Sequence, residues 1–125
     1  MRYPGMFILG AGLLLGHVAP AAAQSVARGK TIFESVCGAC HSLDANRVGP
    51  ALRGVLGRPA GTAPDFAYSV ALGRARHTWD RTKINAWLSN PEKLVPGQAM
   101  NFQMEQAKDR ADVVAYLATQ KATRK

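Results

Sequence analysis

Hydrophobic residues recur at three- and four-residue intervals in three stretches of the chain, and this spacing indicates amphipathic helices. The first stretch follows Ser25 and leads into Cys37, the second lies between Asp80 and Asn90-Pro91, and the third covers about residues 106–120. Serine and aspartate cap helix N-termini, whereas proline ends a helix. No alternating strand pattern or hairpin signal competes with these stretches. The sequence therefore predicts an all-α fold with three main helices.

The segment between the first two predicted helices, about residues 43–77, is rich in glycine and proline. Within it, only residues 65–72 have a composition that suits a short helical turn. A loop of this length is uncommon inside a compact domain unless something other than polypeptide organises it. A large apolar cofactor would supply the missing core, with the loops wrapped around it.

The N-terminus has the pattern of a secretory signal peptide. Arg2 is followed by an apolar run and by three alanines at residues 21–23. The run is short for a bilayer span and His17 interrupts it, which disfavours a retained membrane anchor. We therefore expect residues 1–23 to be cleaved on export to the periplasm, leaving one domain of residues 24–125.

The chain is basic, with a formal net charge of +8 that becomes +7 without Arg2. A surface of this kind attracts acidic partners. No nucleic-acid motif accompanies the positive residues. We expect the partner to be a protein with an acidic surface, and we expect no nucleic acid.

The two cysteines of the chain lie together in the segment CGACH, at Cys37 and Cys40, directly before His41. A disulfide across two residues closes too small a loop to stabilise the fold. A dithiol oxidoreductase usually places its first cysteine at the start of a helix after a buried strand, and no such strand precedes Cys37. A zinc site would need His77 as well, and would need the consecutive Cys40 and His41 to face one ion. Covalent haem attachment uses both thiols and the adjacent imidazole, so the sequence favours it, with the dithiol function as an alternative.

A longer set of segments carries a resemblance to a known family. The segments are GKTIFESVCGACH, VGPALRGVLGR, AGTAPDFAYSVAL, TW, WLSNPEKLVPGQAM and RADVVAYL. In this order, and over residues 28–117, they resemble the class I cytochromes c, in particular mitochondrial cytochrome c and bacterial cytochrome c2. The resemblance implies a cytochrome c fold around one haem c, bound covalently through Cys37 and Cys40.

The same resemblance implies that His41 and Met100 are the two axial ligands of the haem iron. Met104 and His77 are the alternatives to Met100, although Met104 suits apolar packing better. A neutral sulfur ligand in a buried site favours ferrous iron and raises the reduction potential. With both axial positions filled, no substrate reaches the iron, and the resemblance implies an electron carrier and not an enzyme.

Further positions receive roles from the resemblance. It implies that the Pro50 carbonyl accepts a hydrogen bond from the His41 ring, which would fix the imidazole. It also implies that Arg58, Tyr68 and Trp79 hydrogen-bond or screen the haem propionates. The expected walls and edge of the pocket are Leu52, Leu88, Leu117 and Phe102.

Three residues depart from the family pattern near the sulfur ligand. Trp87 replaces a common Tyr, Leu72 a common Asn and Gln98 a frequent Thr. From these replacements we expect fewer hydroxyl and amide contacts to the Met100 sulfur, with an effect on the potential that the sequence does not fix.

The expected function is one-electron transfer between periplasmic or membrane-bound redox proteins by a monomer without a stable membrane anchor. Val36, Glu92 and Ala99 occupy positions near the haem edge that are often lysine, so steering toward an acidic partner would be weaker there. An alternative function is that of an electron-donating subunit dedicated to one redox enzyme.

Overall fold

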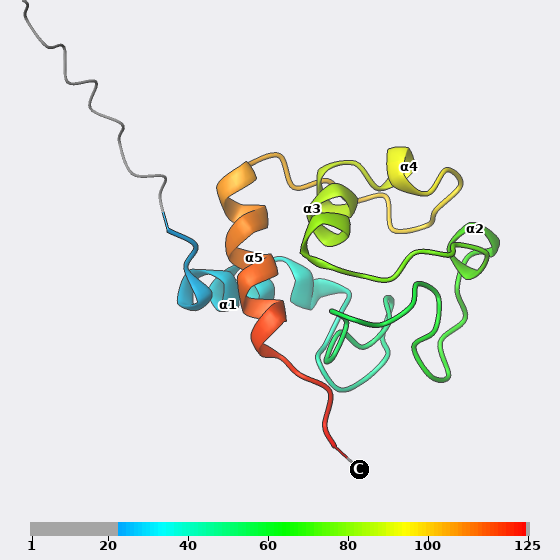
Figure 1. Cartoon of the computed structure of the whole chain (residues 1–125), viewed down its shortest axis with the longest axis horizontal. Helices are drawn as coiled ribbons and strands as arrows, with labels where there is room; N and C mark the ends of the chain where they lie inside the picture. The colour runs from blue at the N-terminus through cyan, green and yellow to red at the C-terminus, as the bar shows by residue number, and fades with distance from the viewer. Residues whose placement is uncertain (1–22, 125) are drawn as a thin grey trace, which may run out of the picture.

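The computed structural model describes residues 23–124, and its regular structure is helical (Figure 1). The elements are α1 (Val26–Ser35), the 3₁₀ turn η1 (Cys37–Ala39), α2 (Val70–Gly73), α3 (Arg81–Ser89), α4 (Pro91–Leu94) and α5 (Ala107–Thr119). Within the described residues, the pairing closest to a sheet is one isolated bridge between Pro59 and Thr78. The prediction of an all-α fold with three main helices, here α1, α3 and α5, is confirmed.

The predicted helix caps are present. The Arg28 backbone N–H donates to the Ser25 hydroxyl at the start of α1, and the Lys83 N–H donates to the Asp80 carboxylate at the start of α3. Each bond satisfies a backbone donor that the first helical turn leaves free. The short polar side chains thus set where both helices begin.

Two short helices differ from the sequence-based prediction. The turn expected over residues 65–72 begins only at Val70, because Ser69 caps it there and Asp65 has a φ of 58°. The Asn90-Pro91 pair ends α3 as expected, but Pro91 also begins α4, with Asn90 as its cap. Proline suits the first helical position because that residue needs no intrahelical N–H bond.

The terminal helices α1 and α5 cross at close range. A Cβ on Gly29 would lie 1.9 Å from the Asp112 carbonyl oxygen, so only glycine permits this approach. Beside the crossing, the rings of Phe33 and Tyr116 pack with their centroids 5.4 Å apart. Gly29 therefore allows the close crossing of the two terminal helices.

The long segment between η1 and α3 follows an irregular path on one side of the helices (Figure 1). Its turns are held by backbone hydrogen bonds to distant residues, including Gly57 N–H to the Trp79 carbonyl and Trp79 N–H to the Arg58 carbonyl. Together with α3 and α5, this segment encloses an apolar cavity. The loop is therefore arranged around an interior that the polypeptide alone does not fill.

The predicted signal peptide lies almost entirely outside the described residues. Among residues 23–124, none of the helices combines the length and the apolarity that crossing a bilayer requires.

Candidate functional site

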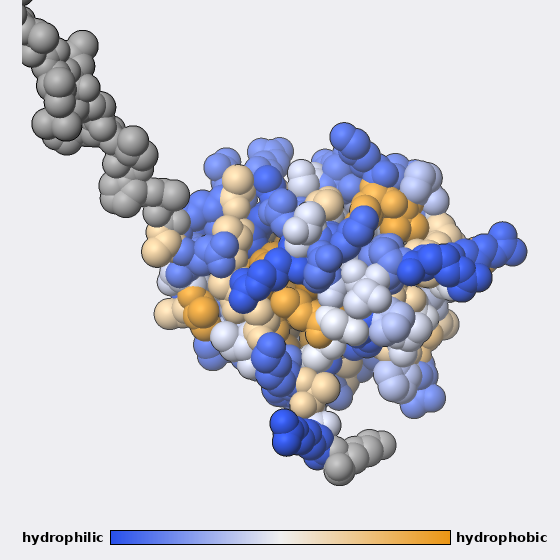
Figure 2. Space-filling model, viewed as in Figure 1, coloured by the Kyte–Doolittle hydropathy of each residue, from blue (hydrophilic) through white to orange (hydrophobic). Residues whose placement is uncertain are grey.

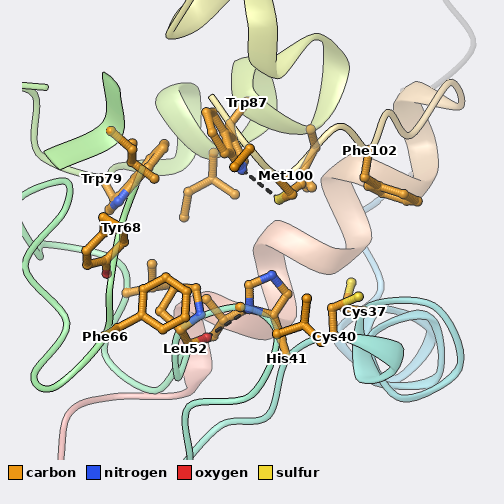
Figure 3. Close-up of a pocket in the computed structure, with 18 of the residues that line it drawn as sticks. Cys37, Cys40, His41, Leu52, Phe66, Tyr68, Trp79, Trp87, Met100 and Phe102 are labelled. Carbon is orange, nitrogen blue, oxygen red and sulfur yellow. Dashed lines mark hydrogen bonds between the residues drawn. The ribbon is translucent and has the colours of Figure 1, made fainter. Parts of the chain in front are cut away.

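The cavity has a volume of about 330 Å³ and is lined mainly by apolar side chains (Figure 3). The four residues expected to form its walls and edge, Leu52, Leu88, Leu117 and Phe102, all contribute to the lining. The polar lining atoms are few. An apolar enclosure with a small number of placed polar groups is typical of a cofactor site.

His41 points into the cavity from the side of η1. Its Nδ1 lies 2.8 Å from the Pro50 carbonyl oxygen, which can only accept, so Nδ1 carries the hydrogen and Nε2 keeps a lone pair. Burial lowers the pKa of His41, which keeps the ring neutral. A Cβ on Gly49 would lie 2.2 Å from the imidazole Cε1, so glycine is required beside this ring. The predicted hydrogen bond to Pro50 is therefore present, and it orients an imidazole that is ready to bind a metal.

Both thiols lie at the edge of the same cavity, and neither forms a disulfide. Figure 3 shows Cys37 and Cys40 side by side next to His41. Burial raises the pKa of the Cys37 thiol to about 11. Since thiol–disulfide exchange depends on the thiolate, this environment opposes the dithiol alternative.

Met100 lies on the opposite side of the cavity from His41 (Figure 3). The indole N–H of Trp87 donates to its sulfur at a distance of 3.1 Å. We expected fewer hydroxyl and amide contacts to this sulfur. The indole N–H is a donor of another kind, and it stands where the family commonly has a tyrosine hydroxyl. A thioether sulfur has more than one lone pair, so this bond leaves another directed elsewhere.

The two alternatives to Met100 are placed differently. Met104 is 7% exposed, belongs to the hydrophobic core and is not part of the cavity lining. His77 also lies outside the lining and packs edge-on against Trp79, with ring centroids 4.4 Å apart. Of the three candidates, only Met100 reaches the cavity.

Arg58, Tyr68 and Trp79 line the cavity, and Figure 3 shows Tyr68 and Trp79 on the side away from the cysteines. The Tyr68 hydroxyl accepts from the Ala63 N–H, which leaves its own O–H free to donate. Arg58 donates to the Ala51 carbonyl through one terminal nitrogen, while its Nε is buried and has no partner among the described residues. Burial lowers the pKa of Arg58. A half-buried guanidinium whose Nε is buried and has no partner among the described residues fits an anionic group such as a propionate.

Two contributions to the site were not predicted from the sequence. The exposed Arg47 donates to the carbonyls of Gly38, Ala39 and His41, and so fastens the turn that carries the cysteines. Phe66 lines the cavity and packs edge-on against Tyr68. No sequence motif marks Arg47, since its role depends on how the loop folds back. Phe66 lies in a segment that the resemblance covered, but no role was assigned to it.

Comparison with known proteins agrees with this geometry. Residues 26–121 match the profile of the family described as Cytochrome c. The chain is 47% identical over 97 residues to cytochrome c of Euglena viridis, an alignment that covers 75% of this chain and 95% of that protein. It is 40% identical over 115 residues to a cytochrome c2 of Rhodopseudomonas palustris, covering 78% and 100%. Among solved structures, it is similar to cytochrome cH from Methylobacterium extorquens, with a TM-score of 0.73, 41% identity and coverage of 76% and 98%.

The fold and the site thus define a small α-helical protein built around a covalently bound tetrapyrrole. The chain belongs to the cytochrome c family, as the sequence resemblance indicated. Members of this family carry one covalently bound haem c and are electron carriers, not enzymes. The apolar cavity, the paired thiols and the unpaired Arg58 donor fit that group.

Proposed function

We propose that this protein is a periplasmic one-electron carrier in which His41 and Met100 bind the haem iron from opposite sides. One observation carries the proposal. The imidazole held by Pro50 and the thioether held by Trp87 approach the same apolar cavity from opposite walls, with both cysteines at its edge. Haem c supplies an iron that alternates between the ferrous and ferric states.

The residues of the chain each have a defined task in this proposal. Cys37 and Cys40 form the thioether links that retain the ring. His41 presents Nε2 because its Nδ1–H is bound to Pro50. Met100 would hold the iron from the opposite wall, so a substrate would have to displace a protein ligand to reach it. The apolar walls exclude water and disfavour the extra charge of ferric haem, which raises the potential.

We assign the propionates to the side of the cavity that holds Arg58, Tyr68 and Trp79. Arg58 Nε offers a buried donor that has no partner in residues 23–124, and the Tyr68 hydroxyl, which accepts from Ala63, can still donate its own hydrogen. Trp79 covers this side of the cavity, and its ring packs edge-on against Trp87 with centroids 5.5 Å apart. These residues would compensate two carboxylates that would otherwise be costly to bury.

The axial assignment is tested by the visible spectrum of the haem-loaded protein in both oxidation states. The ferric protein should show the weak far-red band of methionine-sulfur ligation. Met100→Leu should abolish this band, and the matched variant Met104→Leu should keep it, because Met104 packs in the core. Loss of the band in Met104→Leu alone would overturn the assignment.

We further propose that residues 1–23 direct export and are removed, and that the basic monomer exchanges electrons with redox proteins that have acidic docking surfaces. The net charge of +7 without Arg2 supports this choice of partner. In periplasmic fractions, the mature N-terminus should lie near Gln24. The rate of electron transfer to an acidic partner should fall as ionic strength rises, and a rate independent of salt would contradict an electrostatic encounter.

A further inference from the structure

The loop that carries Met100 contains a buried polar side chain that the proposed electron-transfer role does not explain. Gln98 is 7% exposed, and among the described residues only Asp112 shares its status as a polar residue in the buried set. A buried amide costs free energy unless hydrogen bonds satisfy it. The position and partners of Gln98 therefore need a reason.

The hydrogen-bond partners of the Gln98 amide are Asn101, directly after Met100, and Glu92 in α4. Its Nε2 donates to Asn101 Oδ1 at 2.9 Å and to Glu92 Oε2 at 3.3 Å. Its Oε1 accepts from the Asn101 backbone N–H at 3.0 Å. Both donor hydrogens and the acceptor oxygen of the amide are used, so this side chain links positions on either side of Met100.

Glu92 extends the link to α4. Its Oε1 accepts from the Gly97 N–H at 2.9 Å while its other oxygen accepts from Gln98. Glu92 lies in the first turn of α4, where Pro91 is buried. The carboxylate thus attaches the loop to a short helix that is itself fixed against the domain.

The backbone of this loop needs such support. Gly97 has a φ of 86° and Asn101 a φ of 49°, and both values lie in the left-handed region. Asparagine tolerates this region better than most residues, but the conformation still costs free energy. The bonds to Glu92 and Gln98 hold both residues in it, and Met100 lies between them.

We propose that Gln98, Glu92 and Asn101 form a positioning network that keeps the Met100 sulfur at the cavity. This inference rests on the proposed axial role of Met100. Met100 has no covalent attachment to the cofactor, and a soft thioether prefers ferrous over ferric iron. In the ferric state, retention of Met100 as a ligand therefore depends on the rigidity of the loop that carries it. A loop that is already ordered loses less conformational entropy when Met100 binds the iron.

The network and Trp87 act from different elements. Trp87 on α3 bonds the sulfur itself, whereas the network restrains the backbone before and after Met100. Beyond the network, the Met104 N–H donates to the Leu88 carbonyl at 2.8 Å and joins the end of the loop to α3. The network should therefore govern how readily the sulfur leaves, and Trp87 should govern its electronic character.

The test is a titration of the ferric, haem-loaded protein with imidazole, which displaces the sulfur ligand. Loss of the far-red band reports the displacement. Gln98→Met keeps the length of the side chain but removes its hydrogen bonds, and we expect about tenfold tighter imidazole binding. Glu92→Ala, which alters an exposed side chain, should give a smaller increase of a few-fold. Glu92→Gln retains an acceptor for the Gly97 N–H and should restore most of the wild-type behaviour.

Two controls separate positioning from general stability. Gln103→Met removes an exposed amide of the same type just beyond the loop and should bind imidazole as the wild type does. Gly29→Ala weakens the distant crossing of α1 and α5 and should lower the unfolding free energy without changing imidazole binding.

Each outcome decides the proposal. Wild-type imidazole binding in both Gln98→Met and Glu92→Ala, with the far-red band intact, would overturn the network but leave Met100 as ligand. An equal increase in Gly29→Ala would also overturn it, because stability alone would then explain the effect. Survival of the band in Met100→Leu would instead overturn the axial assignment itself. If Gln98→Met fails to bind haem, the comparison of imidazole binding between Glu92→Ala and Glu92→Gln tests the proposal instead.

Discussion

At the scale of single residues, the two proposed ligands are oriented by one hydrogen bond each. Pro50 fixes the His41 ring, and Trp87 fixes the Met100 sulfur. The two bonds act in opposite directions on the iron. A carbonyl that accepts from imidazole makes the ring a stronger electron donor, whereas an N–H that donates to sulfur withdraws electron density from it. Their balance adjusts the reduction potential.

Trp87→Phe removes the N–H donor and keeps a smaller aromatic ring at this buried position. We expect a lower reduction potential, because a more electron-rich sulfur stabilises ferric iron. A hydrogen bond of about 1 kcal/mol corresponds to about 40 mV for one electron. Redox titration measures the shift. Tyr116→Phe, which alters a buried aromatic at the crossing of α1 and α5, should leave the potential unchanged, and a rise in Trp87→Phe would contradict the prediction.

Gly49→Ala should prevent normal ligation by His41. The added Cβ would lie 2.2 Å from the imidazole Cε1, so the ring or the loop must move, at a cost of about 3 kcal/mol or more. We expect a large loss in the yield of haem-loaded protein, or a spectrum without normal axial ligation. Gly73→Ala is the matched control, because its Cβ would lie 4.0 Å from its nearest neighbour. Normal spectra for both variants would contradict the prediction.

At the scale of elements, one carboxylate joins the start of α1 to the middle of α5. Asp112 is 0% exposed and accepts from the Ser25 N–H at 2.7 Å, from Arg28 at 2.7 Å and from Lys108 at 3.0 Å. These partners lower the pKa of Asp112 to about 2, with the Ser25 N–H as the largest cause. Asp112 therefore contacts α1 in two ways. Its backbone carbonyl packs against Gly29, and its side chain fixes the start of the helix.

The lowered pKa of Asp112 predicts where acid weakens the fold. The pKa of the Asp112 carboxyl is about 2 in the folded protein and 3.8 for an unperturbed aspartate, as in the unfolded chain. Between these pH values the unfolded chain therefore binds more protons than the folded protein. The stabilisation is therefore complete above pH 3.8 and is lost as the pH falls toward 2. Asp112→Asn should be less stable at pH 7 and should show a flatter loss of stability in this window. Denaturant unfolding at several pH values measures both effects.

The exposed Asp65 provides the control for this experiment. Asp65→Asn should retain the wild-type dependence of the unfolding free energy on pH between 3.8 and 2. If Asp112→Asn instead retained the wild-type slope, another carboxylate would be responsible for the acid sensitivity.

At the scale of the whole molecule, the domain is arranged around the apolar cavity. The visible face in Figure 2 is mostly hydrophilic, with hydrophobic side chains gathered in small areas. Two of the exposed hydrophobic residues, Val36 and Val48, also line the cavity, and Val48 is 78% exposed. The margin of the site is therefore apolar, although the chain as a whole is basic.

Removal of the cofactor should unfold much of the protein. At about 24 cal/mol per Å³, a cavity of 330 Å³ corresponds to about 8 kcal/mol, which is comparable to the stability of a whole domain. We expect the chain produced without haem to lose helicity in circular dichroism and to exchange its amide hydrogens rapidly over residues 43–77. Cooperative unfolding of that chain with native-like protection would contradict the prediction.

Features that depend only on neighbouring residues could be predicted from the amino-acid sequence. The spacing of Cys37, Cys40 and His41, the caps at Ser25 and Asp80, and the periodicity of the helices are local properties, so one-dimensional patterns predict them. The loop between η1 and α3 was recognised as needing a cofactor but could not be traced, because its turns are fixed by contacts with distant residues.

Contacts between distant polar groups, in contrast, follow from the way the chain packs. The Trp87 bond to the Met100 sulfur and the three-way contact of Asp112 join residues that the folded backbone brings together. The burial of Arg58 Nε, which has no partner among the described residues, depends on the same packing. A hydrogen bond requires a donor–acceptor distance set to a few tenths of an ångström and a favourable angle at the hydrogen. Sequence patterns fix which side chains share a face, but such geometry arises only after the helices and loops have packed around a common centre.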